Sequence, residues 1–329
     1  MRQTLSPVLM KVRQIGLLAL KSVITAGLLW FLASKIDVRA VAVQLRSIQV
    51  YWAVAAITIL FGQLLLTGIR WYIVGRLVSA AIGLGQAVRL ALVGQFFNQV
   101  LPTSFGGDAV RAWLLLREKV PIGRAVISII CDRLAALVVL TVIVAVTMLL
   151  LSDAGLNVPI FKKLAIIAPA LTASGLLCLL LLGEKISEMF QRNRLLRPVG
   201  ILVGNLRIVL FTSVKSILVL GLALLVQVMV VLVVLVCAMA IGIHLGAIQV
   251  LLLPSILLIS MVPISFAGWG VRESAMVVGL GFAGISSPEA LAISLLFGLT
   301  QIMIGVPGGV MWLLRRVGKT RDYSRTATL

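Results

Sequence analysis

The feature that most constrains this chain is its series of long apolar segments, which alternate with short stretches that carry most of the charge. A helix needs about 20 apolar residues to cross the roughly 30 Å hydrocarbon core of a bilayer. Six segments approach or exceed that length: Ile15–Ser34, Val50–Gly68, Gly123–Leu151, Leu164–Gly183, Ser216–Ile241 and Glu289–Leu314. Apolar residues make up 61% of the chain and charged residues only 12%, which is too few to cover a soluble surface. The sequence therefore predicts an all-α polytopic membrane protein with about six full spans.

Two further segments, Gln86–Arg117 and Ala247–Ile285, differ from these simple spans. Each has an apolar half, a break rich in proline and glycine, and a second apolar half. A proline removes a backbone donor and clashes with the preceding turn, so it interrupts a helix. We therefore expect two broken helical hairpins in place of two continuous spans.

The basic residues are distributed unevenly around the apolar segments. Twenty-one of the 29 Lys and Arg residues fall in the stretches 1–14, 69–89, 111–124, 184–215 and 315–329. Only five fall in the stretches 35–49, 152–163 and 242–248. Cytoplasmic loops are enriched in Lys and Arg, so we expect a multi-pass protein of the cytoplasmic (inner) membrane with both termini in the cytoplasm. The two hairpins would then enter from opposite sides, as opposed re-entrant hairpins.

The two breaks also resemble each other, which indicates an inverted repeat. Residues 102–111 align without gaps on residues 263–272, and six of the ten positions are identical. We expect a single integral membrane domain over residues 1–329. Its first half is expected at about 15–183, its second half at about 216–314, and a basic cytoplasmic loop at 184–215 between them.

The residue types in the breaks favour anion binding. Glycine allows a chain to reverse and lets a ligand approach the backbone. The two breaks contain Gly106, Gly107, Gly268 and Gly270. A helix that starts after each break presents free N–H groups and its positive dipole end. Arg111 and Arg272 in the first turns add a planar fork that matches phosphate. The alternative is a pair of structural kinks whose arginines merely pair with carboxylates.

Other polar groups lie near the breaks or inside the apolar segments. Asp108 and Arg111 are three residues apart and so share one helical face. Glu273 follows Arg272, and Asn98 belongs to a polar patch before the first break. Asp132 and Arg133 are expected roughly 14 Å into their helix, where charges are costly and either line a cavity or pair with each other. By contrast, Arg70 lies beside Trp71 near the end of a span and is expected to be an interfacial anchor.

Several classes of function are disfavoured by the composition. The basic residues that give the net charge of +19 lie between the apolar segments, where the enrichment of cytoplasmic loops in Lys and Arg explains them. We therefore expect no nucleic-acid partner. Cys131, Cys178 and Cys237 sit singly in apolar segments and read as small hydrophobic residues. With one histidine in the chain, we expect no metal and no cofactor.

The motifs Pro102-x-x-x-Gly-Gly-Asp-x-x-Arg111, Asp132-Arg133 and Gly268-Trp-Gly-Val-Arg-Glu273 resemble the transmembrane region of the lysylphosphatidylglycerol synthase/flippase family. The resemblance covers about residues 15–315 and implies a protein that moves a phospholipid or related lipid between leaflets. By motif position it implies roles in headgroup binding and translocation for Asp108, Arg111, Asp132, Arg133, Arg272 and Glu273. Two-part members carry a soluble aminoacyl-transferase domain after this region. Because the chain stops about fifteen residues after its last span, lysyl-lipid synthesis is not expected of it.

Three functions remain to be weighed. The first is a flippase-like transporter of an anionic phospholipid or isoprenoid-linked lipid, without enzyme activity and without a GxxxxGK[ST] loop for ATP. The second is an intramembrane enzyme that transfers a lipid-linked group, for which the acidic residues are few. The third is a non-catalytic scaffold of a lipid, polyprenyl or hopanoid biosynthesis pathway, bound to a biosynthetic partner. A homo-oligomer is also expected to be accessible through small residues of the last span: Gly298, Gly305, Gly308 and Gly309.

Overall fold

The computed structural model describes residues 7–101, 105–153, 159–262 and 264–326. In these residues the chain forms twelve α-helices, one short 3₁₀ helix and no strand, so the prediction of an all-α protein is confirmed. Five helices are long and apolar enough to cross a bilayer, which makes this an integral membrane protein. They are α3 (Val50–Leu77), α6 (Ile122–Asp153), α7 (Pro159–Arg192), α9 (Val214–Ala240) and α12 (Ser287–Thr326). The expected first span falls within α1 (Pro7–Lys35), a 29-residue helix outside these five.

Each of the two broken segments forms a pair of short helices packed against each other. The first pair is α4 (Leu84–Val100) and α5 (Gly106–Arg117). The second pair is α10 (Ala247–Ser260) and α11 (Val271–Gly281), with the 3₁₀ helix η1 (Phe266–Gly268) between them. The break prolines Pro102 and Pro263 lie outside the described residues. The helices of each pair end and begin on the two sides of the predicted break, so both breaks fall where the sequence predicts them.

The glycines of the two breaks serve different purposes. Before α11 the backbone adopts positive φ at Ala267, Gly268 and Gly270, with φ of 48°, 81° and 87°. That left-handed region strongly favours glycine, so the chain reverses at the second break as expected. Gly107 instead lies in the first turn of α5, where a methyl group would collide with the carbonyl oxygen of Gly94. At the first break, the absence of a side chain at Gly107 lets the backbones of α4 and α5 approach each other.

Most of the segment 184–215, expected as a loop, is helical. Helix α7 continues to Arg192, and α8 (Arg197–Phe211) follows after a short turn. The buried side chains of α8, which include Val209 and Leu210, join the hydrophobic interior, and the helix packs on α6, α7 and α9. The basic residues of this stretch predict a cytoplasmic loop, and in the structure the apolar residues between them pack a helix against the bundle.

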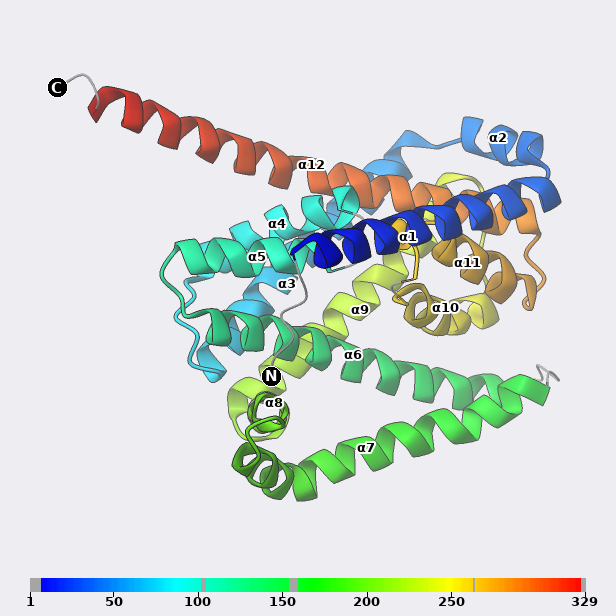
Figure 1. Cartoon of the computed structure of the whole chain (residues 1–329). Coiled ribbons are helices and arrows are strands. Elements are labelled where there is room, and N and C mark those ends of the chain that lie inside the picture. The colour runs from blue at the N-terminus through cyan, green and yellow to red at the C-terminus, as the bar shows by residue number, and fades with distance from the viewer. Residues whose placement is uncertain (1–6, 102–104, 154–158, 263, 327–329) are drawn as a thin grey trace.

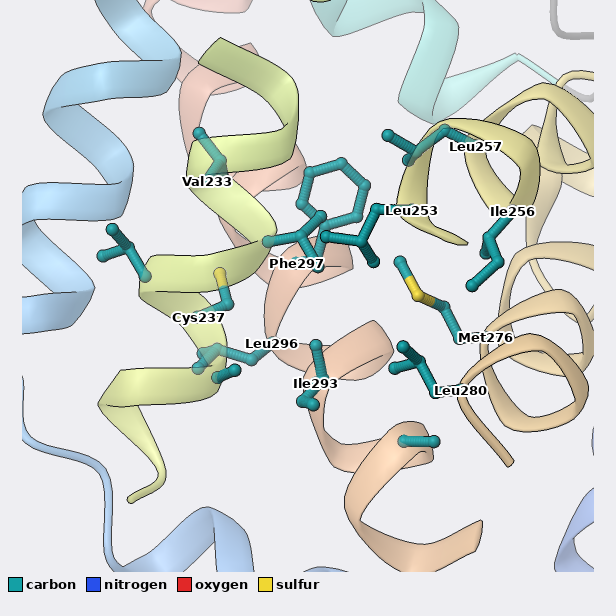
Figure 2. Close-up of a cluster of buried hydrophobic side chains, with 14 of the residues drawn as sticks. Val233, Cys237, Leu253, Ile256, Leu257, Met276, Leu280, Ile293, Leu296 and Phe297 are labelled. Carbon is teal, nitrogen blue, oxygen red and sulfur yellow. The ribbon is translucent and has the colours of Figure 1, made fainter. Parts of the chain in front are cut away.

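The helices, shown in Figure 1, are arranged around two hydrophobic clusters. The first cluster, which includes Leu64, Leu140 and Val233, combines buried residues from α1–α4, α6 and α9–α12. Figure 2 shows part of it, with side chains of α10 and α11 facing those of α9 and α12. The second cluster, which includes Trp71 and Val219, lies between α3, α4, α5, α6, α8 and α9. Helix α6 and helix α7 form a long hairpin, and α12 runs across the bundle beside α4 (Figure 1).

The glycines of α12 contact this chain itself. Methyl groups at Gly308 and Gly309 would collide with the Leu92 carbonyl oxygen and the Phe96 ring of α4, and one at Gly305 would press on the Phe96 backbone. A methyl group at Gly298 would collide with the Arg272 side chain. The sequence suggests these small residues as an oligomerisation surface. In the structure they allow α12 to approach α4 and α11.

Candidate functional site

The polar residues of the long helices lie between the two hydrophobic clusters. Along α3, Leu64 belongs to the first cluster and Trp71 to the second, and Arg70 lies in the interval. Along α6, Asp132 lies at the end of the second cluster, which stops at Ala135 before the first cluster begins at Leu140. Helix α9 repeats this order, with buried Gln227 between its two apolar halves. Three helices thus place a polar layer at the same level of the bundle.

A cavity of about 350 Å³ opens at this level and is called the central cavity below. Seven elements contribute to its wall: α3, α4, α5, α6, α9, α10 and α12. Its charged lining residues are Arg70, Arg111, Asp132 and Arg133. Its neutral polar lining residues are Gln63, Thr67, Gln95, Asn98, Gln227, Ser260 and Gln301. The apolar remainder of the wall comes largely from α6, α9 and α10.

Five charged residues at the cavity form two hydrogen-bonded groups, Arg70–Asp132 and Arg111–Asp108–Arg133, which together are called the charge network below. Arg70 Nε and Nη2 donate to the two carboxylate oxygens of Asp132 at 2.8 and 3.1 Å. Asp108 accepts from two arginines, from Arg111 Nη1 at 3.1 Å and from Arg133 Nε at 2.7 Å. All of these residues except Arg133 are buried; the Arg133 side chain is 42% exposed. The charge network holds α3, α5 and α6 together.

The charge network has one more positive charge than negative charge, because three arginines face two carboxylates. The Nη1 atom of Arg70 and the Nε and Nη2 atoms of Arg111 are buried and have no hydrogen-bond partner among the described residues. A buried donor without a partner costs about 1–3 kcal/mol, and more when the group is charged. The site therefore has unused hydrogen-bonding capacity of the kind that an anion satisfies.

The surroundings of Arg111 keep its guanidinium in place without closing the cavity. The guanidinium carbon lies 3.8 Å from the ring centroid of Trp71, and the indole nitrogen of Trp71 donates to Ser128 Oγ at 3.3 Å. Gly94 on α4 makes room for the stem of Arg111, since a methyl group there would lie 2.7 Å from Arg111 Cδ. Arg111 is therefore oriented by a stacked aromatic ring and by Asp108.

The N-terminus of α5 is already capped by a side chain of α4. Asn98 Oδ1 accepts from the Gly107 N–H at 2.9 Å. One of the N–H groups expected to be free at the start of α5 is therefore occupied. Asn98 also lines the central cavity, which links the cap to the site.

Arg272 lies in a second, separate cluster and is not among the residues that line the central cavity. Its Nε and Nη2 atoms donate to Glu273 Oε1 at 3.0 and 2.6 Å, and Ser294 Oγ donates to the same oxygen at 3.2 Å. Glu273 Oε2 accepts from the Gly270 N–H at 2.6 Å, so this acid caps the start of α11. The Trp269 ring centroid lies 4.7 Å from the Arg272 guanidinium carbon. Both break arginines thus have a carboxylate partner, an aromatic ring and a facing glycine.

The structure brings some of the expected site residues together and corrects one reading. Asp108, Arg111, Asp132 and Arg133 meet in one network, but Asp132 pairs with Arg70 and not with Arg133. Arg70 is not an interfacial anchor, because it is buried and its partner lies 62 residues away in sequence. Gln63, Gln227 and Gln301 were not singled out from the sequence. A glutamine amid apolar residues of a span is a usable signal, because an amide is costly there without a partner.

Comparison with known proteins supports the sequence resemblance. No curated protein and no solved structure matches the chain. A family model described as "Lysylphosphatidylglycerol synthase TM region" matches residues 18–309, which is nearly the whole chain. This chain therefore belongs to the family of the lysylphosphatidylglycerol synthase transmembrane region.

Proposed function

We propose that this protein is a flippase-like transporter, without enzyme activity, that moves an anionic lipid between the leaflets of the cytoplasmic membrane. The observation that carries the proposal is the central cavity, where buried guanidinium atoms of Arg70 and Arg111 lack hydrogen-bond partners. A phosphate group supplies the oxygens that these atoms need, and arginine binds phosphate through paired hydrogen bonds. Family membership supports a membrane function related to lipids.

The proposed topology has six spans, with α1 as the sixth, and two re-entrant helix pairs. The α4–α5 pair enters from the cytoplasm and the α10–α11 pair enters from the outside, which makes them an inverted repeat. Both pairs contact α12, the α4–α5 pair through α4 and the α10–α11 pair through α11. Both chain termini face the cytoplasm in this arrangement, as the distribution of basic residues favours.

In the proposed mechanism, a headgroup enters the central cavity while its hydrocarbon chains stay in the bilayer. The phosphate competes with Asp108 for the Arg111 guanidinium and binds the free donors of Arg70 and Arg111. Arg133, the most exposed member of the charge network, meets the headgroup first. Arg272 and Glu273 join α11 to α12 through Ser294, at the other end of the proposed path.

The test is lipid translocation in proteoliposomes. We expect Arg111→Gln to lower the rate of lipid movement by at least about tenfold, which corresponds to about 1.4 kcal/mol in the transition state. The matched control is Arg39→Gln, which removes the same charge from the exposed surface of α2 (Val38–Arg46), away from the cavity. Equal lipid movement by wild type and a correctly folded Arg111→Gln variant contradicts the proposal and favours a scaffold.

A further inference from the structure

We infer that, between transport events, the central cavity binds a small monovalent inorganic anion such as chloride, and that this anion leaves when a headgroup enters. The binding of the anion belongs to the resting protein and does not depend on what the protein transports. The exchange of the anion for a headgroup rests on the proposed function. Three observations carry the inference: where the surplus charge lies, which buried donors are unpartnered, and what the rest of the wall offers.

The surplus charge lies in one of the two groups of the charge network. Arg70 and Asp132 form a one-to-one pair, which is neutral. In the other group a single carboxylate, that of Asp108, serves both Arg111 and Arg133, which leaves one positive charge. An uncompensated charge inside a membrane protein is costly, so it is normally paired or directed toward water.

Arg111 is the member of this group whose charge is compensated least. It is 6% exposed, whereas the side chain of Arg133 is 42% exposed and reaches water more easily. Arg111 Nη1 donates to one oxygen of Asp108 at 3.1 Å, while Arg133 Nε donates to the other oxygen at 2.7 Å. The Trp71 ring, 3.8 Å from the Arg111 guanidinium carbon, attracts the cation but carries no charge. Positive charge therefore remains at Arg111.

Unpartnered donors lie on the same wall as this charge. Arg111 Nε, Arg111 Nη2 and Arg70 Nη1 are buried and have no hydrogen-bond partner among the described residues, and both arginines line the central cavity. Water can accept from these donors, but water is neutral and leaves the charge uncompensated. A monovalent anion accepts from the donors and also balances the single surplus charge. The charge is therefore the reason to expect an anion in place of water alone.

The rest of the wall suits a small anion that keeps part of its hydration shell. The cavity measures about 350 Å³, and a water molecule takes up about 30 Å³ in the liquid, so an anion and several waters fit. Gln63 Nε2 donates to Thr67 and Gln95 Nε2 donates to Gln301, which leaves a second N–H on each amide nitrogen. Both carboxylates of the lining and its charge network are already bound to arginine, which limits their repulsion of an anion.

The exchange follows from the shared donors. A phosphate headgroup needs the same N–H groups of Arg70 and Arg111, and one surplus charge compensates only one monovalent anion at a time. The two anions therefore compete. Between transport events the inorganic anion keeps the arginines compensated, and its release accompanies the arrival of a headgroup.

The first experiment measures chloride binding to the full chain in a non-ionic detergent, with gluconate as the background anion. Binding is followed by the broadening of the chloride NMR signal and by its reversal with bromide. We expect Arg111→Gln to weaken chloride binding by at least about tenfold. The matched control, Arg39→Gln, removes the same charge from the exposed surface of α2 and should bind as the wild type does. No saturable binding by the wild type, or an equal loss in both variants, overturns the inference.

A second variant separates charge compensation from hydrogen bonding. Arg133→Gln removes the surplus charge, leaves the unpartnered donors of Arg70 and Arg111 in place, and keeps an amide that can donate to Asp108. Because the Arg133 side chain is partly exposed, we expect this variant to fold. Its chloride affinity should fall by at least about tenfold. An unchanged affinity would show that the surplus charge does not hold the anion, and overturns the inference.

Lipid movement separates the inference from the proposed function. Proteoliposomes contain acyl-labelled phosphatidylglycerol at several mole fractions, in chloride or in gluconate at equal ionic strength. Chloride at ten times its measured Kd should raise the mole fraction for half-maximal movement by about tenfold and leave the maximal rate unchanged. Movement that is insensitive to chloride overturns the exchange.

The combined outcomes distinguish the two proposals. Chloride binding without any lipid movement overturns the transport proposal and supports the anion site. Lipid movement without chloride binding overturns the anion site while the transport proposal stands. Absence of both overturns both.

Discussion

At the residue scale, each buried carboxylate at the central cavity stabilises arginines that would be costly alone. Asp132 holds Arg70 through two hydrogen bonds, and Asp108 is shared by Arg111 and Arg133. Buried charges contribute little net stability when paired, but the loss of one partner leaves an uncompensated charge. The same residues that shape the site are therefore also needed for the fold around it.

A substitution at Asp132 tests this dependence. Asp132→Asn leaves the buried Arg70 charge without its counter-charge, so we expect the free energy of unfolding to fall by about 3–5 kcal/mol. Unfolding in detergent, followed by circular dichroism, measures the change. The double variant Arg70→Met/Asp132→Leu removes both charges and should recover most of the stability. Equal loss in the single and double variants would show that the pair acts through packing alone.

Sequence spacing predicts contacts within one helix and misses those between helices. The pair Asp108–Arg111 follows from its three-residue separation. The pair Arg70–Asp132 depends on how α3 packs against α6, which no local pattern reveals. For that reason the sequence alone favours an interfacial anchor at Arg70, beside Trp71. Arg272 and Glu273 are consecutive in the sequence, which does not show that they lie apart from the central cavity.

At the element scale, the breaks and the long apolar helices could be predicted because both signals are local. Proline and two glycines within ten residues mark each break, although Pro169, Pro254 and Pro307 lie inside α7, α10 and α12. About 20 apolar residues identify a candidate span. The helical character of α8 was missed, because its apolar face is short and lies between basic residues. The intrachain contacts of the α12 glycines are not apparent from the sequence, since packing within a chain and packing between chains use the same residue types.

The contact between α4 and α12 gives a prediction at this scale. Gly308→Ala places a methyl group against the Leu92 carbonyl oxygen, so the two helices must separate, and we expect a loss of about 1–3 kcal/mol in unfolding free energy. The control is Gly221→Ala on α9, where no atom lies within 4 Å and alanine favours the helix. Thermal unfolding in detergent compares the two. Equal melting temperatures would contradict the close α4–α12 contact.

At the scale of the whole molecule, the proposed topology with two re-entrant helix pairs predicts which side of the membrane each turn reaches. The turn before α4 and the turn after α5 must reach the same side if the first pair is re-entrant. The turns before α10 and after α11 must reach the opposite side for the same reason. Two continuous spans would instead place the turns of each pair on opposite sides. The accessibility of four positions therefore distinguishes the two topologies.

Single cysteines report this accessibility in a variant whose three native cysteines are replaced by alanine. We expect Ala81→Cys and Gly123→Cys to react with a membrane-impermeant thiol reagent only after the cytoplasmic face is opened. His244→Cys and Ser287→Cys should react in intact cells. All four positions are exposed, so the side of the membrane decides the labelling. Labelling of Ala81→Cys and Gly123→Cys from opposite sides would make α4 and α5 a continuous span. The charge network would then lack the re-entrant helix that the proposed transport path requires.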